Sequence, residues 1–318
     1  MIQLSVRETV DYLKEHNDYV IVTHRRPDGD TIGSAAALCL ALRAYGKRAS
    51  VLENPQVTPK FRPLLEELTT GYVIDRETLI AVDVATEGLL PDNVADRAGQ
   101  FELLIDHHGK NTHYATRGFW DPGAAACGEM ILRVVFGLGV SLTKRIGEAV
   151  YIALSTDTGC FRYGNTTSYT HRAAASCCES AADIEGINES LFMQKSHARM
   201  KLNAYLIETT EFYADGLVAF SVIPAELREK LELTEDDLDD VAGFGREFRG
   251  VGIGVMVRQE GETGRVSIRT SRDYDAAAIC AKLGGGGHKG AAGATIPGDI
   301  EIVKKTVLRA IRHSGIRL

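Results

Sequence analysis

Residues 20–34, VIVTHRRPDGDTIGS, decide the fold of the first half of the chain. The apolar, β-branched run at the start predicts a buried strand. A polar loop comes next, and the alanine- and leucine-rich segment 35–42, AAALCLAL, then predicts a helix. This order places His24, Asp28 and Asp30 at the carboxyl end of a strand, the edge at which open α/β sheets bind ligands.

Two interpretations of this loop remain open. An imidazole and two carboxylates within seven residues suit a divalent cation, and the nitrogen donor favours manganese, zinc or iron over calcium. A Pro-Asp-Gly turn with a capping aspartate also serves any connection between a strand and a helix. The loop by itself does not decide between a metal site and a solvated turn.

The pattern recurs along the chain. A second strand at 48–52, RASVL, completes a strand–helix–strand unit, which predicts a parallel sheet. Two further apolar runs end in polar residues, LIAVDV at 79–84 with Asp83 and FELLIDHHG at 101–109. A carboxylate next to a buried strand needs compensation by charge or hydrogen bonds. A capping or ordinary turn aspartate is the alternative for Asp83.

Adjacent side chains of an extended segment point in opposite directions, so His107 and His108 are predicted to have different roles. One imidazole would bind a metal and the other the substrate, with Asp106 as the partner of a histidine.

The helix predicted at 144–155 leads to Asp157. A carboxylate at a helix C-terminus favours a nearby cation, and an ordinary turn aspartate is the alternative. Residues 61–70 predict a short helix and 111–120 a loop.

Composition limits the classes of partner. The 318 residues allow two domains, and 44% hydrophobic and 25% charged residues are ordinary for a soluble protein. A net charge of −7 argues against binding long duplex nucleic acid. The six cysteines form no CxxC pair, which favours a reduced, cytoplasmic protein, and no apolar run is long enough to span a membrane.

In the second half of the chain, glycine becomes more frequent and apolar residues alternate with polar ones. We predict a catalytic domain at 1–195, a helical linker at 196–212 and a smaller α/β domain at 213–318. The segment 284–293, GGGGHKGAAG, is interpreted as a loop of bare backbone N–H groups next to a helix start, which is suited to phosphate. A flexible surface loop is the alternative. The side chains expected to complete an anion pocket are those of Arg269, Ser271, Arg272, His288 and Lys289.

Five motifs in this order, THRRPDGDTIGS, VDVAT, LLIDHHG, STDTG and GGGGHKGAAG, resemble the DHH phosphoesterase superfamily with its C-terminal DHHA1 domain. The resemblance covers nearly the whole chain. The compact layout is most similar to the nano-RNase A type and less similar to the longer RecJ exonucleases. It implies a parallel-sheet DHH domain and a smaller α/β DHHA1 domain, with the active site in the cleft between them.

The resemblance also implies the roles of individual residues. One metal would be bound by His24, Asp28 and Asp83, and a second by Asp30, Asp83, His107 and Asp157, with Asp83 bridging. Manganese is the implied metal, with magnesium or cobalt as substitutes. His108 would contact the substrate phosphate and Asp106 would support it, so the implied catalytic residues are Asp83, Asp106 and His108. The implied substrate-binding positions are His108, Arg269, Ser271, Gly285, Gly286, Gly287 and His288.

The expected activity is two-metal hydrolysis of short, single-stranded oligoribonucleotides to mononucleotides, and of 3′-phosphoadenosine-5′-phosphate to AMP. The alternatives are a phosphodiesterase for cyclic or linear dinucleotides, a pyrophosphatase or exopolyphosphatase, and a nucleotide-binding protein without turnover. A homodimer is compatible with this reading, and no membrane partner is expected.

Overall fold

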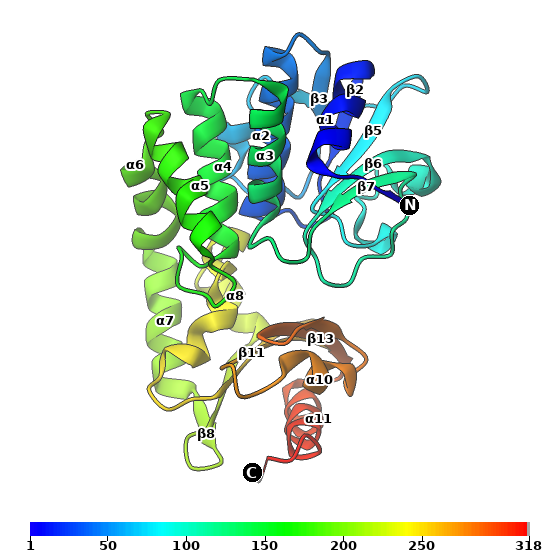
Figure 1. Cartoon of the computed structure of the whole chain (residues 1–318). Coiled ribbons are helices and arrows are strands. Elements are labelled where there is room, and N and C mark those ends of the chain that lie inside the picture. The colour runs from blue at the N-terminus through cyan, green and yellow to red at the C-terminus, as the bar shows by residue number, and fades with distance from the viewer. Residues whose placement is uncertain (317–318) are drawn as a thin grey trace. The chain divides into compact units, whose positions relative to one another are not determined.

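The computed structural model describes residues 1–316 and divides the chain into two compact units, Met1–Gln194 and Lys195–Leu318 (Figure 1). Lys195 begins the second unit, so the segment 196–212 belongs to that unit. Among the described residues, no helix is both long and apolar enough to cross a bilayer.

The first unit is built on a parallel sheet, as predicted. The strands lie in the order β1-β7-β6-β5-β2-β3-β4, and every neighbouring pair is parallel. Their bounds are β1 Ile2–Gln3, β2 Tyr19–Val22, β3 Ala49–Leu52, β4 Thr69–Thr70, β5 Thr78–Val82, β6 Phe101–Asp106 and β7 Arg117–Trp120. The central strands β2, β5 and β6 are almost wholly buried. Because they run in the same direction, their carboxyl ends share one edge of the sheet.

Helices pack tightly in this unit. Their bounds are α1 Val6–Glu15, α2 Gly29–Ala44, α3 Cys127–Leu138, α4 Lys144–Asp157, α5 Ser168–Glu179 and α6 Ile184–Asn188. A Cβ added at Gly33 of α2 would lie 2.3 Å from the carbonyl oxygen of Ala149 in α4. One added at Gly128 of α3 would lie 2.5 Å from the Cβ of Ala153 in α4. Glycine therefore lets α2, α3 and α4 approach closely, and their ends carry site residues.

The second unit has its own sheet and cores. The strands lie in the order β12-β13-β11-β10-β9-β8, with bounds β8 Glu211–Tyr213, β9 Val218–Ile223, β10 Ile253–Glu260, β11 Thr263–Thr270, β12 Gly286–His288 and β13 Ala291–Pro297. Its helices are α7 His197–Thr209, α8 Ala225–Lys230, α9 Glu235–Leu238, α10 Ala276–Ala281 and α11 Ile300–Arg312. One core cluster joins the sheet to α10 and α11, and another includes Leu202 and Leu206 of α7.

The remaining helical segments are short. The 3₁₀ helices have the bounds η1 Arg62–Leu65, η2 Glu87–Leu89, η3 Ala95–Gln100 and η5 Val241–Glu247, and η4 Glu189–Met193 is a π-helix. The prediction of a helix over 61–70 was therefore wrong: η1 covers four residues and β4 begins at Thr69. Pro63 provides no N–H for a helical hydrogen bond, which favours a short turn.

Two predicted loops were also wrong. The segment 111–120 ends in strand β7, which pairs with β6 on one side and β1 on the other. The glycine-rich segment 284–293 forms the hairpin of β12 and β13, and it follows the end of α10 rather than preceding a helix. Pairing with neighbouring strands, rather than local pattern, makes both segments extended.

Candidate metal centre

Three neighbouring parallel strands and two helix ends deliver the predicted ligands of the first unit. His24 follows β2, Asp83 follows β5, and Asp106 ends β6 with His107 immediately after it. The order β6-β5-β2 in the sheet brings these strand ends together. Asp28 and Asp30 stand at the start of α2, and Asp157 ends α4. The fold therefore gathers side chains that lie up to 133 residues apart in sequence.

Asp83 lies at the centre of this arrangement. Its side chain is 3% exposed, and its Oδ1 atom is buried and has no hydrogen-bond partner among the described residues. Burial, together with the carboxylates of Asp30 and Asp28, raises the pKa of Asp83 well above its usual range. Asp83 also has a left-handed backbone, with φ of 61°. An unpartnered buried carboxylate oxygen on a strained residue is typical of a site that binds a cation.

One group of possible ligands lies on the His24 side of Asp83. The Nε2 atom of His24 is 3.6 Å from Oδ1 of Asp28 and 3.8 Å from Oδ2 of Asp83. These separations exceed hydrogen-bond lengths. Two ligand atoms bound to one cation at about 2.1 Å are roughly 3.0–3.5 Å apart, so a small inward movement would suffice for coordination.

A second group lies on the His107 side. The Nε2 atom of His107 is 3.5 Å from Oδ2 of Asp30, 3.7 Å from Oδ2 of Asp157 and 3.5 Å from Oδ1 of Asp83. The other ring nitrogen, Nδ1, lies 3.1 Å from the carbonyl oxygen of Ala124 and must donate to it. This bond leaves the lone pair of Nε2 facing the carboxylates, as a metal-binding histidine requires.

The acidic residues of this second group repel one another in the absence of a cation. Burial and the nearby carboxylate of Asp30 raise the pKa of Asp157 to about 7. Burial also raises the pKa of Asp30, although His107 and two backbone N–H groups oppose the shift. A bound dication would reverse this balance, because it favours the ionised form of every carboxylate that faces it.

Asp30 has a second role that sequence reasoning missed. Its carboxylate accepts hydrogen bonds from the backbone N–H groups of Cys127, at 2.7 Å, and Gly128, at 3.0 Å, and from the hydroxyl of Ser34, at 3.0 Å. Cys127 and Gly128 begin α3, so Asp30 also satisfies the N–H groups at the start of that helix. The small residues of 124–128, AAACG, were the sequence signal for this close approach.

His108 faces a different partner from His107. Its Nδ1 atom donates to Oδ1 of Asp106 at 2.8 Å, and Asp106 is fully buried. Burial opposes charge on both groups, but this hydrogen bond lowers the pKa of Asp106 and raises that of His108. The same Nδ1 atom is 3.5 Å from Oδ1 of Asp83. The geometry therefore places His108 beside the candidate metal ligands with a fixed tautomer.

Apart from His108, the predicted substrate-binding residues lie in the second unit. Arg269 near the end of β11 and His288 at the end of β12 are both in register with Ala291 of β13, so all three share one face of the sheet. A Cβ at Gly285 would lie 2.1 Å from the carbonyl oxygen of Gly293. Gly287, with φ of 145°, lies in the edge strand β12 beside His288.

Two further predicted positions differ in their surroundings. Gly286 has open space where a side chain would lie. Ser271 lies just beyond β11, where its N–H donates to the carbonyl oxygen of Gly252 at 2.9 Å. Contact of any of these residues with substrate stays a prediction, as does a substrate cleft between domains.

The comparisons with known proteins agree with this architecture. The model described as the DHH family, N-terminal domain, matches residues 18–154, and the model of the DHHA1 domain matches 216–313. A Thermus thermophilus protein, the bifunctional oligoribonuclease and PAP phosphatase NrnA, is 34% identical over 301 residues, covering 93% of this chain and 90% of its own.

Two solved structures share the fold. An exopolyphosphatase-related protein from Bacteroides fragilis aligns with a TM-score of 0.84 at 20% identity, over 97% of this chain and 95% of its own. Exonuclease RecJ bound to manganese aligns with a TM-score of 0.51 at 13% identity, over 99% of this chain and 95% of its own. At these identities the similarity shows the fold alone. The two matching models and the Thermus relative show that the chain belongs to the DHH family and contains a DHHA1 domain.

Proposed function

We propose that this protein is a two-metal phosphoesterase that hydrolyses short oligoribonucleotides to mononucleotides and 3′-phosphoadenosine-5′-phosphate to AMP. The observation that carries the proposal is Asp83, whose two carboxylate oxygens face two separate groups of possible ligands. One oxygen faces His24 and the other faces His107. A carboxylate that faces two groups of ligands in this way would help to hold two cations.

The ligand sets are those that the family resemblance implies, and the distances around His24 and His107 support them. His24, Asp28 and Asp83 would hold one cation, and Asp30, Asp83, His107 and Asp157 the other. Mixed imidazole and carboxylate donors suit manganese, with magnesium or cobalt as substitutes. When bound, the two cations would supply a water of lowered pKa as nucleophile and would neutralise charge on the phosphoryl group.

Hydrogen bonds within the protein orient the two histidines of the site. The hydrogen bond that His107 donates to the carbonyl oxygen of Ala124 fixes the tautomer of His107, and Asp106 fixes that of His108. The raised pKa of His108 favours its protonated form, which would donate a charge-assisted hydrogen bond to a phosphoryl oxygen. Asp106 would act through His108 rather than on the substrate.

The substrate class rests on the relatives and on charge. The Thermus relative is named for activity on oligoribonucleotides and PAP, and the alignment covers most of both chains. The net charge of −7 disfavours long polyanions. In the DHHA1 domain, we propose that Arg269, Ser271, His288 and the backbone of Gly285, Gly286 and Gly287 bind phosphate or ribose groups.

The test is turnover of a matched panel in manganese: a ribodinucleotide, a pentaribonucleotide, 3′-phosphoadenosine-5′-phosphate, a cyclic dinucleotide and pyrophosphate. Asp83→Asn provides the blank, and Asp96→Asn, in the 3₁₀ helix η3, provides the matched control. We expect hydrolysis of the short RNAs and the bisphosphate, abolished by Asp83→Asn and retained by Asp96→Asn. Turnover of the cyclic dinucleotide or pyrophosphate alone would refute the substrate assignment.

A further inference from the structure

The ring of His108 is hydrogen-bonded to the buried carboxylate of Asp106, and a second hydrogen bond fixes that carboxylate. Oδ1 of Asp106 accepts the Nδ1–H of His108, and Oδ2 accepts a hydrogen bond from the side-chain amide of Asn111 at 2.6 Å. The amide oxygen of Asn111 accepts the backbone N–H of His113, also at 2.6 Å. This second bond fixes the orientation of the amide, so its NH₂ group must face Asp106.

His108 is also held through its backbone. The indole N–H of Trp120 donates to the carbonyl oxygen of His108 at 2.7 Å. Trp120 is the last residue of β7 and is in register with Asp106, the last residue of β6. The position of the indole is therefore set by strand pairing rather than by a flexible loop.

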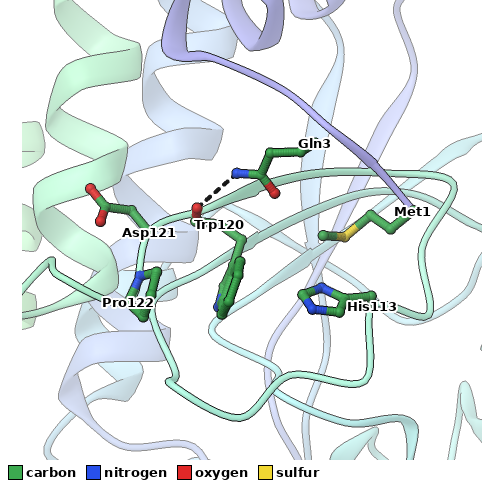
Figure 2. Close-up of a pocket in the computed structure, with 6 residues that line it drawn as sticks. All are labelled: Met1, Gln3, His113, Trp120, Asp121 and Pro122. Atoms are coloured by element: carbon green, nitrogen blue, oxygen red, sulfur yellow. Dashed lines mark hydrogen bonds between the residues drawn. The ribbon is translucent and has the colours of Figure 1, made fainter.

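The two supports are connected. The imidazole of His113 packs edge-on against the indole of Trp120, with ring centroids 4.8 Å apart at 81°. Figure 2 shows the indole between Pro122 and His113, at the wall of an open hollow of about 670 Å³. Contacts thus run in a closed ring through His108, Asp106, Asn111, His113 and Trp120. We call this ring the His108 frame.

We propose that Asn111 and Trp120 are positioning residues that set the location and orientation of the His108 imidazole for phosphoryl transfer. The inference rests on the proposed function, in which His108 contacts the substrate phosphate. A donor aimed at developing charge loses much of its effect when it is displaced by a fraction of an ångström. Both residues lack a carboxylate or imidazole that could bind a metal, so their effect should appear in turnover rather than in metal affinity.

The test compares Trp120→Phe and Asn111→Ala with wild type in manganese. Trp120→Phe keeps an aromatic ring and removes the N–H donor together with part of the indole. We expect kcat to fall about tenfold, within the range seen when the supports of site residues are removed, with KM and the Mn²⁺ dissociation constant changed less than twofold. Gln3→Ala is the matched control, because Gln3 donates to the backbone oxygen of Trp120 at 2.8 Å and this contact is not one of those that close the frame.

A double-mutant cycle separates positioning from a general structural role. In a His108→Ala background, Trp120→Phe should cause no further loss of kcat, because the group that it positions is gone. Additive losses would overturn the inference. So would an unchanged kcat in both single variants, or equal losses of kcat and Mn²⁺ affinity.

A measurement without turnover keeps failure of this inference distinct from failure of the proposed function. In metal-free protein with ¹⁵N-labelled histidine, the Nδ1–H of His108 should give a resonance protected from solvent exchange. Trp120→Phe and Asn111→Ala should each accelerate that exchange at least several-fold, and Gln3→Ala should not. If wild type hydrolysed none of the panel, the proposed function would fail, and this exchange rate would still decide whether the frame holds the ring. Unchanged exchange in both variants would refute the frame.

Discussion

Asp83→Asn should make the metal-free protein more stable and the metal-bound protein less stable than wild type. Asparagine has nearly the same shape as aspartate and tolerates the left-handed backbone at this position. It removes one negative charge from a buried group of carboxylates, which includes Asp30. The opposite effects in the two states would be the signature of a cation site.

The magnitude follows from the distances. Oδ1 of Asp83 and Oδ2 of Asp30 each lie 3.5 Å from Nε2 of His107, so the two oxygens are at most about 7 Å apart. Two unit charges at that separation repel by roughly 2 kcal/mol at an effective dielectric constant of about 20. Nearby imidazoles offset part of this repulsion. A net gain of about 1–3 kcal/mol corresponds to a rise of about 3–8 °C in Tm for a unit of this size.

The gain should depend on pH in a defined direction. The pKa of Asp83 is raised above its usual 3.8 in the folded protein. Protonation of Asp83 therefore stabilises the metal-free wild type fully below pH 3.8. That stabilisation is lost as the pH rises through the raised folded-state pKa of Asp83. The variant lacks this titration, so its advantage should be largest above the raised folded-state pKa and should shrink as the pH falls below it.

The assay is thermal unfolding with and without 1 mM Mn²⁺. A cation that binds with a dissociation constant of about 10 μM would stabilise wild type by about 2.7 kcal/mol at that concentration. Asp83→Asn should lose most of this gain, so the order of the two Tm values should reverse on adding metal. A lower Tm for the variant in metal-free buffer at pH 8, or an equal gain with Mn²⁺, would refute the reasoning.

Other predictions concern single contacts. Gly285→Ala should raise KM about tenfold without changing Mn²⁺ affinity, because the new Cβ would lie 2.1 Å from a carbonyl oxygen of β13. Gly286→Ala places its Cβ in open space and should fold normally. Steady-state kinetics measure KM, and calorimetry measures the Mn²⁺ affinity. Gly33→Ala should destabilise the first unit by about 2 kcal/mol or more through overpacking against α4, as measured by urea unfolding. Gly99→Ala, with nothing within 4 Å, is its control. EDTA should abolish turnover and lower Tm, and Mn²⁺ should restore both; full activity in EDTA would exclude the metal mechanism.

The positions of several candidate ligands in the fold followed from the sequence because local physics determined them. Apolar runs ending in His24, Asp83 and Asp106 predicted strands, and parallel strands place their carboxyl ends at one edge. The prediction that His107 and His108 face different partners also follows from the alternation of an extended chain. The distances separate the two rings only in part, because His108 bonds Asp106 but its Nδ1 atom, like Nε2 of His107, lies 3.5 Å from Oδ1 of Asp83.

The wrong predictions share a cause. Strand β7 has the sequence RGFW, with no clear alternation, and it is extended because β1 and β6 pair with it. The glycine-rich segment has an open conformational range, and pairing with β13 selects the hairpin. A local pattern does not contain the energy of these non-local hydrogen bonds.

The sequence by itself determined the parallel sheet of the first unit, the order of the motifs and the identity of the candidate ligands. Each depends on residue type and on spacing within a few residues. Only the tertiary structure decided that Asp30 holds the start of α3, that Asn111 bonds Asp106, and that Trp120 donates to the backbone oxygen of His108. Those contacts join residues from separate elements, or across a turn, and their geometry depends on how the strands and helices pack together.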